Sequence, residues 1–379
     1  MMRVYLDNNA TTPLHPAVLH ALQDALADVY GNASSIHKEG QTARRRIEDA
    51  RESVARLIGA TAREVVFTSG GTESNNAAIF GAVPLSTRQH IVTTAVEHPS
   101  VIEPVQELGR RGQEITIVPP DRSGEVPAER VIAAIRPETR LVTMMLANNE
   151  TGVIQPVGDV ARVCRERGIL FHCDAVQAAG KIDIDVEALG VDTLSMSAHK
   201  LHAPKGIGAL YVRKGLTLEA YLLGGSQERR RRAGTENVPL AIAFGVAAEI
   251  ARERPDVGAM RDHFELHLGD LAITINGATV PRLPNTSSVT FHGADAEGVV
   301  IGLDLNGVAV STGSACSSGR VEPSRILLAM GLTADEARST VRFSLSRFTT
   351  AEEVDRAAEL VREIVPRASG RGLSAREAG

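Results

Sequence analysis

Short runs of β-branched residues alternate with longer amphipathic segments from about residue 13 to residue 250, and this alternation constrains the fold more than any other feature of the chain. Strands are expected at residues 64–68, 90–94, 114–118, 141–146, 170–174, 193–197 and 208–212. Helices are expected before and between them, at residues 13–30, 36–58, 73–81, 99–109, 127–135 and 157–167. Such alternation is typical of an α/β fold with a mainly parallel, doubly wound sheet, which binds ligands at the carboxyl ends of its strands.

Beyond residue 254 the pattern is looser and predicts a smaller α+β unit. Strands are expected at residues 272–276, 287–292 and 340–345, and helices at residues 257–268, 296–303, 323–330 and 351–365. A chain of 379 residues also exceeds the usual size of one hydrophobic core. We therefore expect a large domain over residues 13–254, a small domain formed by residues 1–12 and 255–379, and a disordered tail at residues 368–379.

Composition excludes several classes of protein. The net charge is −5, from 41 basic and 46 acidic residues, so direct binding of nucleic acid is not expected despite the Arg229–Arg232 run. The chain reaches Asp7 without an apolar stretch, and no run approaches the ~20 apolar residues of a membrane span. The three cysteines form no C-x-x-C pair, so neither a disulfide framework nor a cysteine zinc site is expected. A cytoplasmic protein that does not bind membranes fits these features.

The hexapeptide at residues 195–200, Ser-Met-Ser-Ala-His-Lys, gives the strongest local signal for chemistry. It places Lys200 just past the carboxyl end of an expected strand, which is where a Schiff-base lysine belongs. Ser197 and His199 could donate hydrogen bonds to a phosphate group. A solvent-exposed lysine without a chemical role is the alternative.

Asp174 ends the apolar strand at residues 170–174 and is the natural partner of such a lysine. Pyridoxal phosphate needs a carboxylate against its ring nitrogen, because a protonated nitrogen lets the ring accept electrons. Gln177 could reach the phenolate oxygen of the same ring. Capping of a following helix is the alternative role for Asp174.

Two further segments follow expected strands. Residues 68–74 predict a strand end, a glycine turn at Gly71 and a helix start at Thr72, which together could hold a phosphate. An ordinary strand-to-helix turn is the alternative. His98 follows the strand at residues 90–94 and could stack on a planar cofactor and move protons, although a lone histidine is more often a surface or capping residue. The chain lacks the motif of an ATP-binding P-loop and the glycine fingerprint of a Rossmann dehydrogenase.

Taken together, these motifs closely resemble those of the cysteine desulfurases in the class-V aminotransferase superfamily. The similar segments lie at residues 5–12, 70–76, 97–98, 148–152, 174–177, 197–200, 224–228, 232–237, 313–319 and 341–344. The resemblance covers about residues 4–365. It implies a fold-type I transferase that depends on pyridoxal phosphate and forms a homodimer with shared active sites.

The resemblance also implies a role for each matching residue. Lys200 is similar to the Schiff-base lysine, Asp174 to the pyridinium partner, Gln177 to the phenolate contact, and His98 to the ring-stacking histidine and proton shuttle. The remaining matches are the phosphate ligands Thr72, Ser197 and His199 beside Gly71, the residue Thr235 that reaches the phosphate bound in the neighbouring subunit, and the substrate-carboxylate residues Asn149 and Arg342, with Asn9 nearby. Asn149 is also expected to border the cofactor.

Cys316 decides which reaction the resemblance implies. It lies in the small, polar and glycine-containing segment at residues 311–319, which predicts an exposed loop rather than a core. This long loop resembles that of the nitrogen-fixation and iron–sulfur-cluster enzymes. It implies that Cys316 takes sulfur from L-cysteine as a persulfide, leaves L-alanine, and passes the sulfur to an iron–sulfur scaffold or another acceptor protein.

No metal site is expected, apart from transient iron–sulfur or sulfur ligation at Cys316, and Cys164 and Cys173 are expected to be packing residues. A selenocysteine lyase, or another aminotransferase relative that uses pyridoxal phosphate, would share the cofactor motifs. An interaction protein without activity would be expected to have lost Lys200 or Cys316, and both are present.

Overall fold

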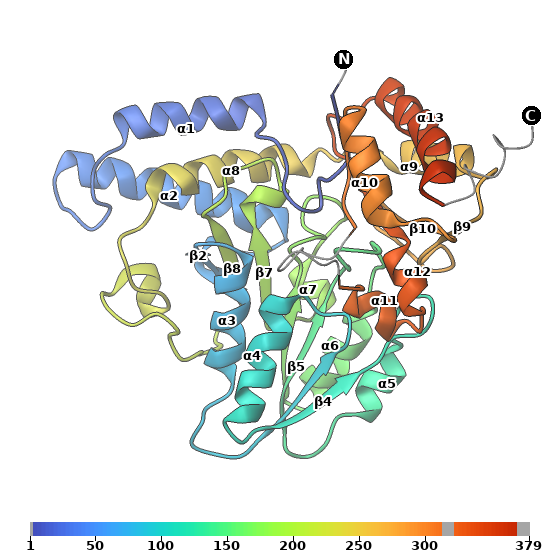
Figure 1. The fold of residues 1–379 in the computed structure, drawn as a ribbon. Helices are drawn as coiled ribbons and strands as arrows, with labels where there is room; N and C mark the ends of the chain where they lie inside the picture. The colour runs from blue at the N-terminus through green and yellow to red at the C-terminus, as the bar shows by residue number, and fades with distance from the viewer. Residues whose placement is uncertain (1–2, 313–321, 370–379) are drawn as a thin grey trace, which may run out of the picture.

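The computed structural model describes residues 3–312 and 322–369, and a central sheet organises most of them (Figure 1). Its strands lie in the order β2-β8-β7-β6-β5-β3-β4. Their bounds are Val65–Thr68 (β2), His90–Thr94 (β3), Glu114–Val118 (β4), Thr139–Met145 (β5), Leu170–Asp174 (β6), Thr193–Ser197 (β7) and Gly208–Val212 (β8). Strand β8 runs antiparallel to β7 and β2, whereas the other neighbours pair in parallel. The predicted mainly parallel α/β sheet is confirmed.

Alternating side chains on the strands divide the core between the two faces of the sheet. Phe67 on β2 packs with Phe244 in the largest hydrophobic cluster, while its neighbour Val66 packs with Ala78 on the opposite face. Helices α3 (Gly71–Ala82) and α4 (Pro99–Arg110) cover that second face. The other helices of this part of the chain are α1 (Pro16–Asp28), α2 (Lys38–Leu57), α5 (Ala128–Ala133), α6 (Val157–Glu166), α7 (Val186–Leu189) and α8 (Val238–Arg252). Figure 1 shows α1, α2 and α8 lying side by side.

A second hydrophobic core surrounds a small antiparallel sheet of order β12-β10-β9. The rings of Phe264, Phe291 and Phe343 meet in this core. Its elements are α9 (Gly258–His267), β9 (Ile273–Ile275), β10 (Thr286–Phe291), α10 (Ala296–Leu305), β12 (Thr340–Ser344) and α13 (Ala351–Ala368). The N-terminal strand β1 (Val4–Tyr5) pairs with β11 (Val308–Ala309) beside it. The chain start therefore packs with the C-terminal unit and then leads to the central sheet.

Several short elements differ from the predicted ones. Strands β1 and β11 were not expected, nor were α7 and α12 (Ala334–Arg338), because two to five residues carry too little periodicity to be recognised. Helix α11 (Arg325–Ala329) places Ile326 in the large hydrophobic cluster, so this segment packs toward the central sheet. The division into residues 13–254 against 1–12 and 255–379 stays a prediction. Helix α13 includes Ala368, and the remainder of the expected tail, from residue 370, lies outside the described residues.

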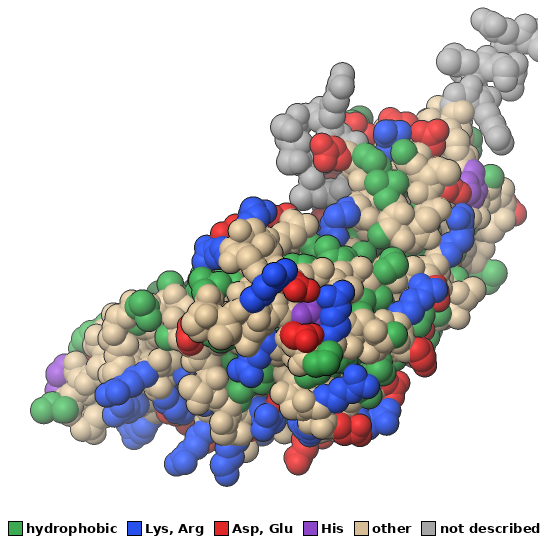
Figure 2. Space-filling view, turned by 90° about the horizontal axis from the view of Figure 1, so that it is seen from below, with side chains coloured by type: hydrophobic (Ala, Val, Ile, Leu, Met, Phe, Trp, Pro, Cys, Tyr) green, Lys and Arg blue, Asp and Glu red, His purple; other side chains and the backbone are tan. Residues whose placement is uncertain are grey.

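The surface carries charges of both signs. Figure 2 shows Lys and Arg side chains interspersed with Asp and Glu side chains on the face seen from below. Within residues 3–312 and 322–369, no helix is both long and apolar enough to cross a membrane.

Candidate active site

The carboxyl ends of the parallel strands surround a cavity of about 270 Å³. Strands β6 and β7 end at Asp174 and Ser197, and His98 and Asn149 follow the ends of β3 and β5. The predicted site residues that line this cavity are Gly71, Thr72, His98, Asn149, Asp174, Gln177, Ser197, His199 and Lys200. Residues that are up to 129 positions apart in the sequence (from Gly71 to Lys200) are thus brought together because parallel strands end at one edge of a sheet.

Lys200 lies just past β7, and its amine is hydrogen-bonded to the backbone near the N-terminus. Its Nζ donates hydrogen bonds to the carbonyl oxygens of Asn9 (2.5 Å) and Ala10 (2.7 Å). Burial, followed by the nearby guanidinium of Arg342, lowers the pKa of Lys200 to about 8, against opposing contributions from Asp7 and Asp174. A lower pKa increases the fraction of neutral amine near neutral pH, and the neutral amine is the nucleophile.

Asp174 is fixed by groups that the sequence interpretation did not select. Its two carboxylate oxygens accept hydrogen bonds from the Asn75 side chain (2.8 Å) and from the backbone N–H of Val176 (2.9 Å). The Oδ1 of Asn75 lies 3.0 Å from Nε2 of His172. Asn75 belongs to the buried face of α3, and a polar residue at a buried helical position was the available signal. This support holds the carboxylate in one orientation toward the cavity.

His98 both caps α4 and faces the cavity, so its two alternative roles coexist. Its Nδ1 accepts a hydrogen bond from the backbone N–H of Ser100 (3.1 Å) and lies 2.7 Å from the Ser100 hydroxyl. Because Nδ1 is an acceptor, the neutral ring carries its proton on Nε2. Burial lowers the pKa of His98, an effect that Asp174 opposes and Lys200 reinforces. The ring is therefore neutral near pH 7 and can donate or accept a proton through Nε2.

The opposite part of the cavity suits an anion. Helix α3 begins at Gly71 after Gly70, which provides no side chain to cap the first N–H groups. A Cβ atom on Gly71 would lie 2.7 Å from a methyl carbon of Val176, so the close packing at this turn requires glycine. Thr72 and His199 line the same region. Burial, followed by the charge of Lys200, lowers the pKa of His199 to about 4, so the ring offers an N–H rather than a full charge.

Arg342 and Asn149 are held together beside the cavity. The guanidinium of Arg342 donates to the Asn149 carbonyl (3.0 Å) and to the carboxylate of Asp7 (2.6 Å). Among the described residues, Nε of Arg342 and Oδ1 of Asn149 are buried without a hydrogen-bond partner. The Asn9 side chain, in contrast, is engaged by protein groups that include the Asn149 carbonyl (3.2 Å) and Thr286 (2.9 Å). A substrate role for each of these residues stays a prediction.

Two further predicted site residues are Thr235 and Cys316. Thr235 is exposed on the loop before α8 and does not line the cavity of its own chain. Cys316 lies outside the described residues. Cys164 and Cys173 are both fully buried, and burial raises the pKa of Cys164 to about 12 and that of Cys173 well above its ordinary value. Neither thiol is therefore suited to form a thiolate.

The carboxyl edge of the mainly parallel sheet thus brings together a lysine, a supported carboxylate and the start of a helix, which is the usual place for a ligand in this class of fold. The model of the family "Aminotransferase class-V" matches residues 4–357. The chain is 45% identical to the cysteine desulfurase IscS of Dictyoglomus turgidum, over 96% of this chain and 94% of the relative. It is 46% identical to the IscS of Anaeromyxobacter dehalogenans, over 96% and 92%.

The solved structures agree with this assignment. A "NIFS-LIKE PROTEIN" superposes with a TM-score of 0.89 at 37% identity, covering 97% of this chain and 100% of the other. A structure described as SspA in complex with cysteine gives a TM-score of 0.84 at 37% identity, covering 92% and 100%. The chain belongs to the class-V aminotransferase family and, within it, to the cysteine desulfurases.

Proposed function

We propose that this cysteine desulfurase binds pyridoxal 5′-phosphate in the cavity at the sheet edge and converts L-cysteine to L-alanine through a persulfide on Cys316. The observation that carries the proposal is the arrangement of Lys200, whose pKa is lowered to about 8, with the supported carboxylate of Asp174 in one cavity. The relative named as SspA was solved with cysteine, which supports the same substrate here.

The residues present fit this cofactor. Lys200, the supported carboxylate of Asp174 and the start of α3 line one cavity, which matches the aldehyde, ring nitrogen and phosphate of the cofactor. Nε of Arg342 and Oδ1 of Asn149, which are buried without a partner among the described residues, suit the carboxylate and amine of an amino-acid substrate. Lys200 would hold the cofactor covalently, Asp174 would contact its ring nitrogen, and Gln177 its ring oxygen. The phosphate would bind Thr72, Ser197 and His199 at the start of α3. The cofactor would supply an electron sink that stabilises negative charge at the substrate's α-carbon.

In the proposed reaction, residues of this chain would bind the substrate, move its protons and take its sulfur. Arg342 binds the substrate carboxylate, and the free amine of Lys200 takes the α-proton. Nε2 of His98 passes a proton to or from the substrate. The Cys316 thiolate attacks the substrate sulfur, so that an S–S bond forms as the carbon–sulfur bond breaks. The β-carbon would keep the electron pair and gain a proton, and return of a proton to the α-carbon would then complete alanine.

We further propose a homodimer in which Thr235 reaches the phosphate bound in the neighbouring subunit. Thr235 is exposed in the single chain, as are Tyr30 (80%), Ile36 (90%) and Leu223 (87%). Apolar side chains this exposed favour a protein contact. Within a cytoplasmic setting, the persulfide sulfur would pass to an iron–sulfur scaffold or another acceptor protein.

The test compares wild type with Cys316→Ser, Cys164→Ala and Lys200→Ala, each loaded with the cofactor and given L-cysteine and a reductant. Wild type and the control Cys164→Ala should release sulfide and alanine. Cys316→Ser should keep the visible absorbance band but release no sulfide, and Lys200→Ala should lose the band. Sulfide release by Cys316→Ser at the wild-type rate would remove Cys316 from the proposal. Much faster turnover of selenocysteine than cysteine would instead indicate a selenocysteine lyase.

A further inference from the structure

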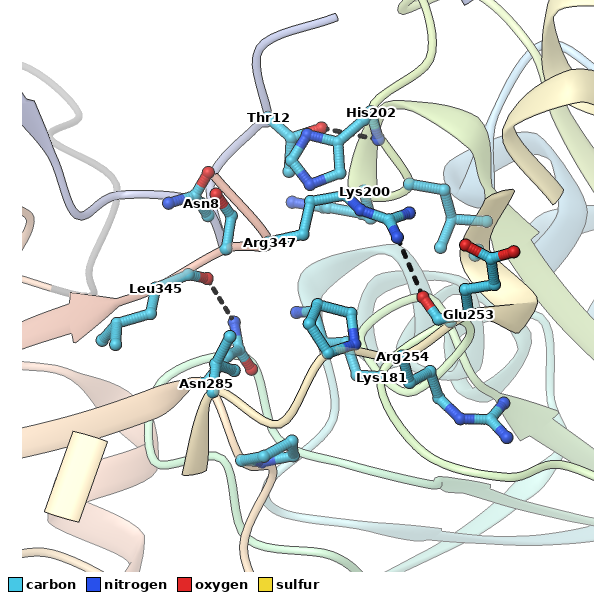
Figure 3. A pocket seen from close by; sticks show the side chains of 17 residues that line it. Asn8, Thr12, Lys181, Lys200, His202, Glu253, Arg254, Asn285, Leu345 and Arg347 are labelled. Carbon is cyan, nitrogen blue, oxygen red and sulfur yellow. Dashed lines mark hydrogen bonds between the residues drawn. The ribbon is translucent and has the colours of Figure 1, made fainter. Parts of the chain in front are cut away.

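A second lysine, Lys181, is close enough to Lys200 for the charge of Lys200 to lower the pKa of Lys181, but it does not line the active-site cavity. Figure 3 shows Lys181 and Lys200 among the side chains that line a separate cavity of about 70 Å³, together with His202 and Arg347. Lys200 lines both this cavity and the active-site cavity. Neither the sequence interpretation nor the proposed reaction uses Lys181.

The amine of Lys181 contacts two side chains that border the active site. Its Nζ donates to Oε1 of Gln177 (2.9 Å) and to Oδ1 of Asn9 (2.9 Å). Two is also the number of hydrogen bonds that a neutral amine can donate. Burial, followed by the charges of Lys200 and Arg342, lowers the pKa of Lys181 well below that of a free lysine. Both protonation states can make these two bonds, so the contact does not depend on the charge of Lys181.

These contacts fix the Gln177 amide from both ends. Its Nε2 donates to the backbone carbonyl of Asn9 (2.9 Å), which can only accept, while its Oε1 faces the Lys181 amine, which donates. The amide cannot turn over without placing oxygen against oxygen. Gln177 also lines the active-site cavity, and Nε2 carries a second N–H that can be donated to a ligand there.

Lys181 also contacts Asn9, whose backbone carbonyl accepts a hydrogen bond from Lys200. The Asn9 carbonyl accepts from both Lys200 (2.5 Å) and Gln177, and the Asn9 side chain accepts from Lys181 and from Asn285 (3.1 Å). Asn9 is thus the junction between the two lysines and the glutamine. A change at Lys181 would reach Lys200 through this residue.

We propose that Lys181 is a positioning residue that keeps the Gln177 amide turned with its N–H toward the cofactor ring and holds the Asn9 carbonyl against Lys200. The inference rests on the proposed function, since the ring oxygen that would accept this N–H belongs to pyridoxal phosphate. Without Lys181, Oε1 of Gln177 and Oδ1 of Asn9 each lose a donor, so the Gln177 amide is held only through its Nε2 and is positioned less firmly. A displaced Gln177 N–H would be a weaker donor to the ring oxygen of the bound cofactor, and a more basic ring oxygen would move the titration of the loaded protein to higher pH.

Other charged groups face this region and must stay constant in a test. Arg342, Asp7 and Asp174 act on the pKa of Lys200. The pKa values of His98 and His199 respond to Lys200, and that of His202 responds to Lys181. Substitutions at Lys181 leave all of these side chains in place.

The experiment titrates the visible absorbance band of the full chain loaded with pyridoxal phosphate, in the absence of substrate. Lys181→Met should move the pH midpoint upward by about one unit. Lys181→Arg, which keeps the N–H donors, should return the midpoint to about the wild-type value. Lys214→Met, which removes an exposed lysine, is the matched control and should leave the midpoint unchanged. If Lys181→Met does not fold, Lys181→Gln is titrated with the same expectation, because its shorter side chain does not reach both acceptors.

A double-variant comparison then shows whether Lys181 acts through Gln177. In a Gln177→Leu background, adding Lys181→Met should shift the midpoint by much less than it does in wild type. An equal shift in both backgrounds, or an unchanged midpoint in folded Lys181→Met, would overturn the inference. Failure of the wild-type protein to form the visible band would instead contradict the proposed cofactor, so the two failures are distinguishable.

Discussion

Asp174 and Arg342 are oppositely charged groups of one site, and the protein holds them in opposite ways. The Asp174 carboxylate is buried, and both of its oxygens accept hydrogen bonds from protein groups. Arg342 is equally buried, yet its Nε has no partner among the described residues, and neither has Oδ1 of the neighbouring Asn149. Within residues 3–312 and 322–369, the Asp174 carboxylate therefore has partners at both oxygens, whereas the Arg342 side of the site keeps two buried atoms without one.

This difference separates a permanent ligand from a transient one. A buried polar atom without a partner costs about 1–3 kcal/mol, so a ligand that supplied the missing partners at Arg342 and Asn149 would gain affinity from them. The hydrogen bonds that fix Asp174 suit a cofactor that stays bound through many turnovers. The open donors and acceptors at Arg342 and Asn149 suit a substrate that arrives and leaves.

The largest effect on activity is expected at Asp174, whose two carboxylate oxygens both have hydrogen-bond partners. If Asp174 keeps the cofactor's ring nitrogen protonated, as proposed, Asp174→Ala should lower kcat by roughly 10³-fold, the scale seen when a preorganised electrostatic group is lost. The visible spectrum of the loaded protein should change as well, while KM changes little. The matched control is Asp159→Ala, an exposed aspartate paired with Arg162 on α6. A fall in activity that appears only in KM would contradict the assignment of Asp174 to the cofactor.

At the side of the site formed by Arg342 and Asn149, Arg342→Lys should mainly raise KM. A lysine keeps the charge but cannot bind a carboxylate with two parallel N–H groups. Because breaking a buried charge pair costs about 2–5 kcal/mol, kcat/KM of this variant should fall by roughly 10²-fold or more. Steady-state kinetics with L-cysteine measure the split, and the visible band should stay unchanged. Arg338→Lys, at an exposed arginine on α12, provides the comparison. If kcat fell alone, Arg342 would not be the carboxylate-binding group.

The two sides also act in opposite directions on Lys200. Arg342 lowers its pKa and Asp174 raises it, and the pKa of Lys200 is about 8. The neutral amine captures the cofactor, so the capture rate in cofactor-free protein should rise about tenfold per pH unit below pH 8 and level off above it. Stopped-flow absorbance measures the profile. Arg342→Met should move the plateau to higher pH because a nearby positive charge is lost, and a shift to lower pH would contradict this electrostatic account.

Sequence reasoning located the residues that lie close to strand ends. Asp174, Ser197 and Lys200 were identified because each ends or follows a strand that is recognisable within a few positions. The same holds for the long helices, since α2 was expected over residues 36–58 and runs from Lys38 to Leu57. Local periodicity is enough for such elements because each repeats its pattern over several turns or strands.

The supporting residues could not be found in this way. Asp7 and Arg342 are 335 positions apart, and Asn75 reaches Asp174 across 99 positions, so their contacts exist only once the sheet and the small unit have assembled. Strands β1 and β11 likewise depend on each other rather than on their own sequence, since each has two residues. Local sequence pattern therefore predicts the candidate functional residues near strand ends, whereas the residues that orient them depend on tertiary packing.

The smallest effect is expected at Asp7, which connects the two sides of the comparison. Its carboxylate accepts from Arg342 at 2.6 Å and is 21% exposed, so it would compete for one guanidinium nitrogen with a substrate carboxylate bound as proposed. Asp7→Asn keeps an acceptor oxygen in the same place but removes the negative charge that repels the substrate. KM for L-cysteine should therefore fall by a few-fold, about 0.5–1 kcal/mol, as is usual for a partly exposed charge pair. Asp270→Asn, at an exposed aspartate paired with Arg362, should leave KM unchanged. A rise in KM for Asp7→Asn would mean that the charge of Asp7 is needed to hold Arg342 in place, and the open side of the site would then be as firmly built as the side around Asp174.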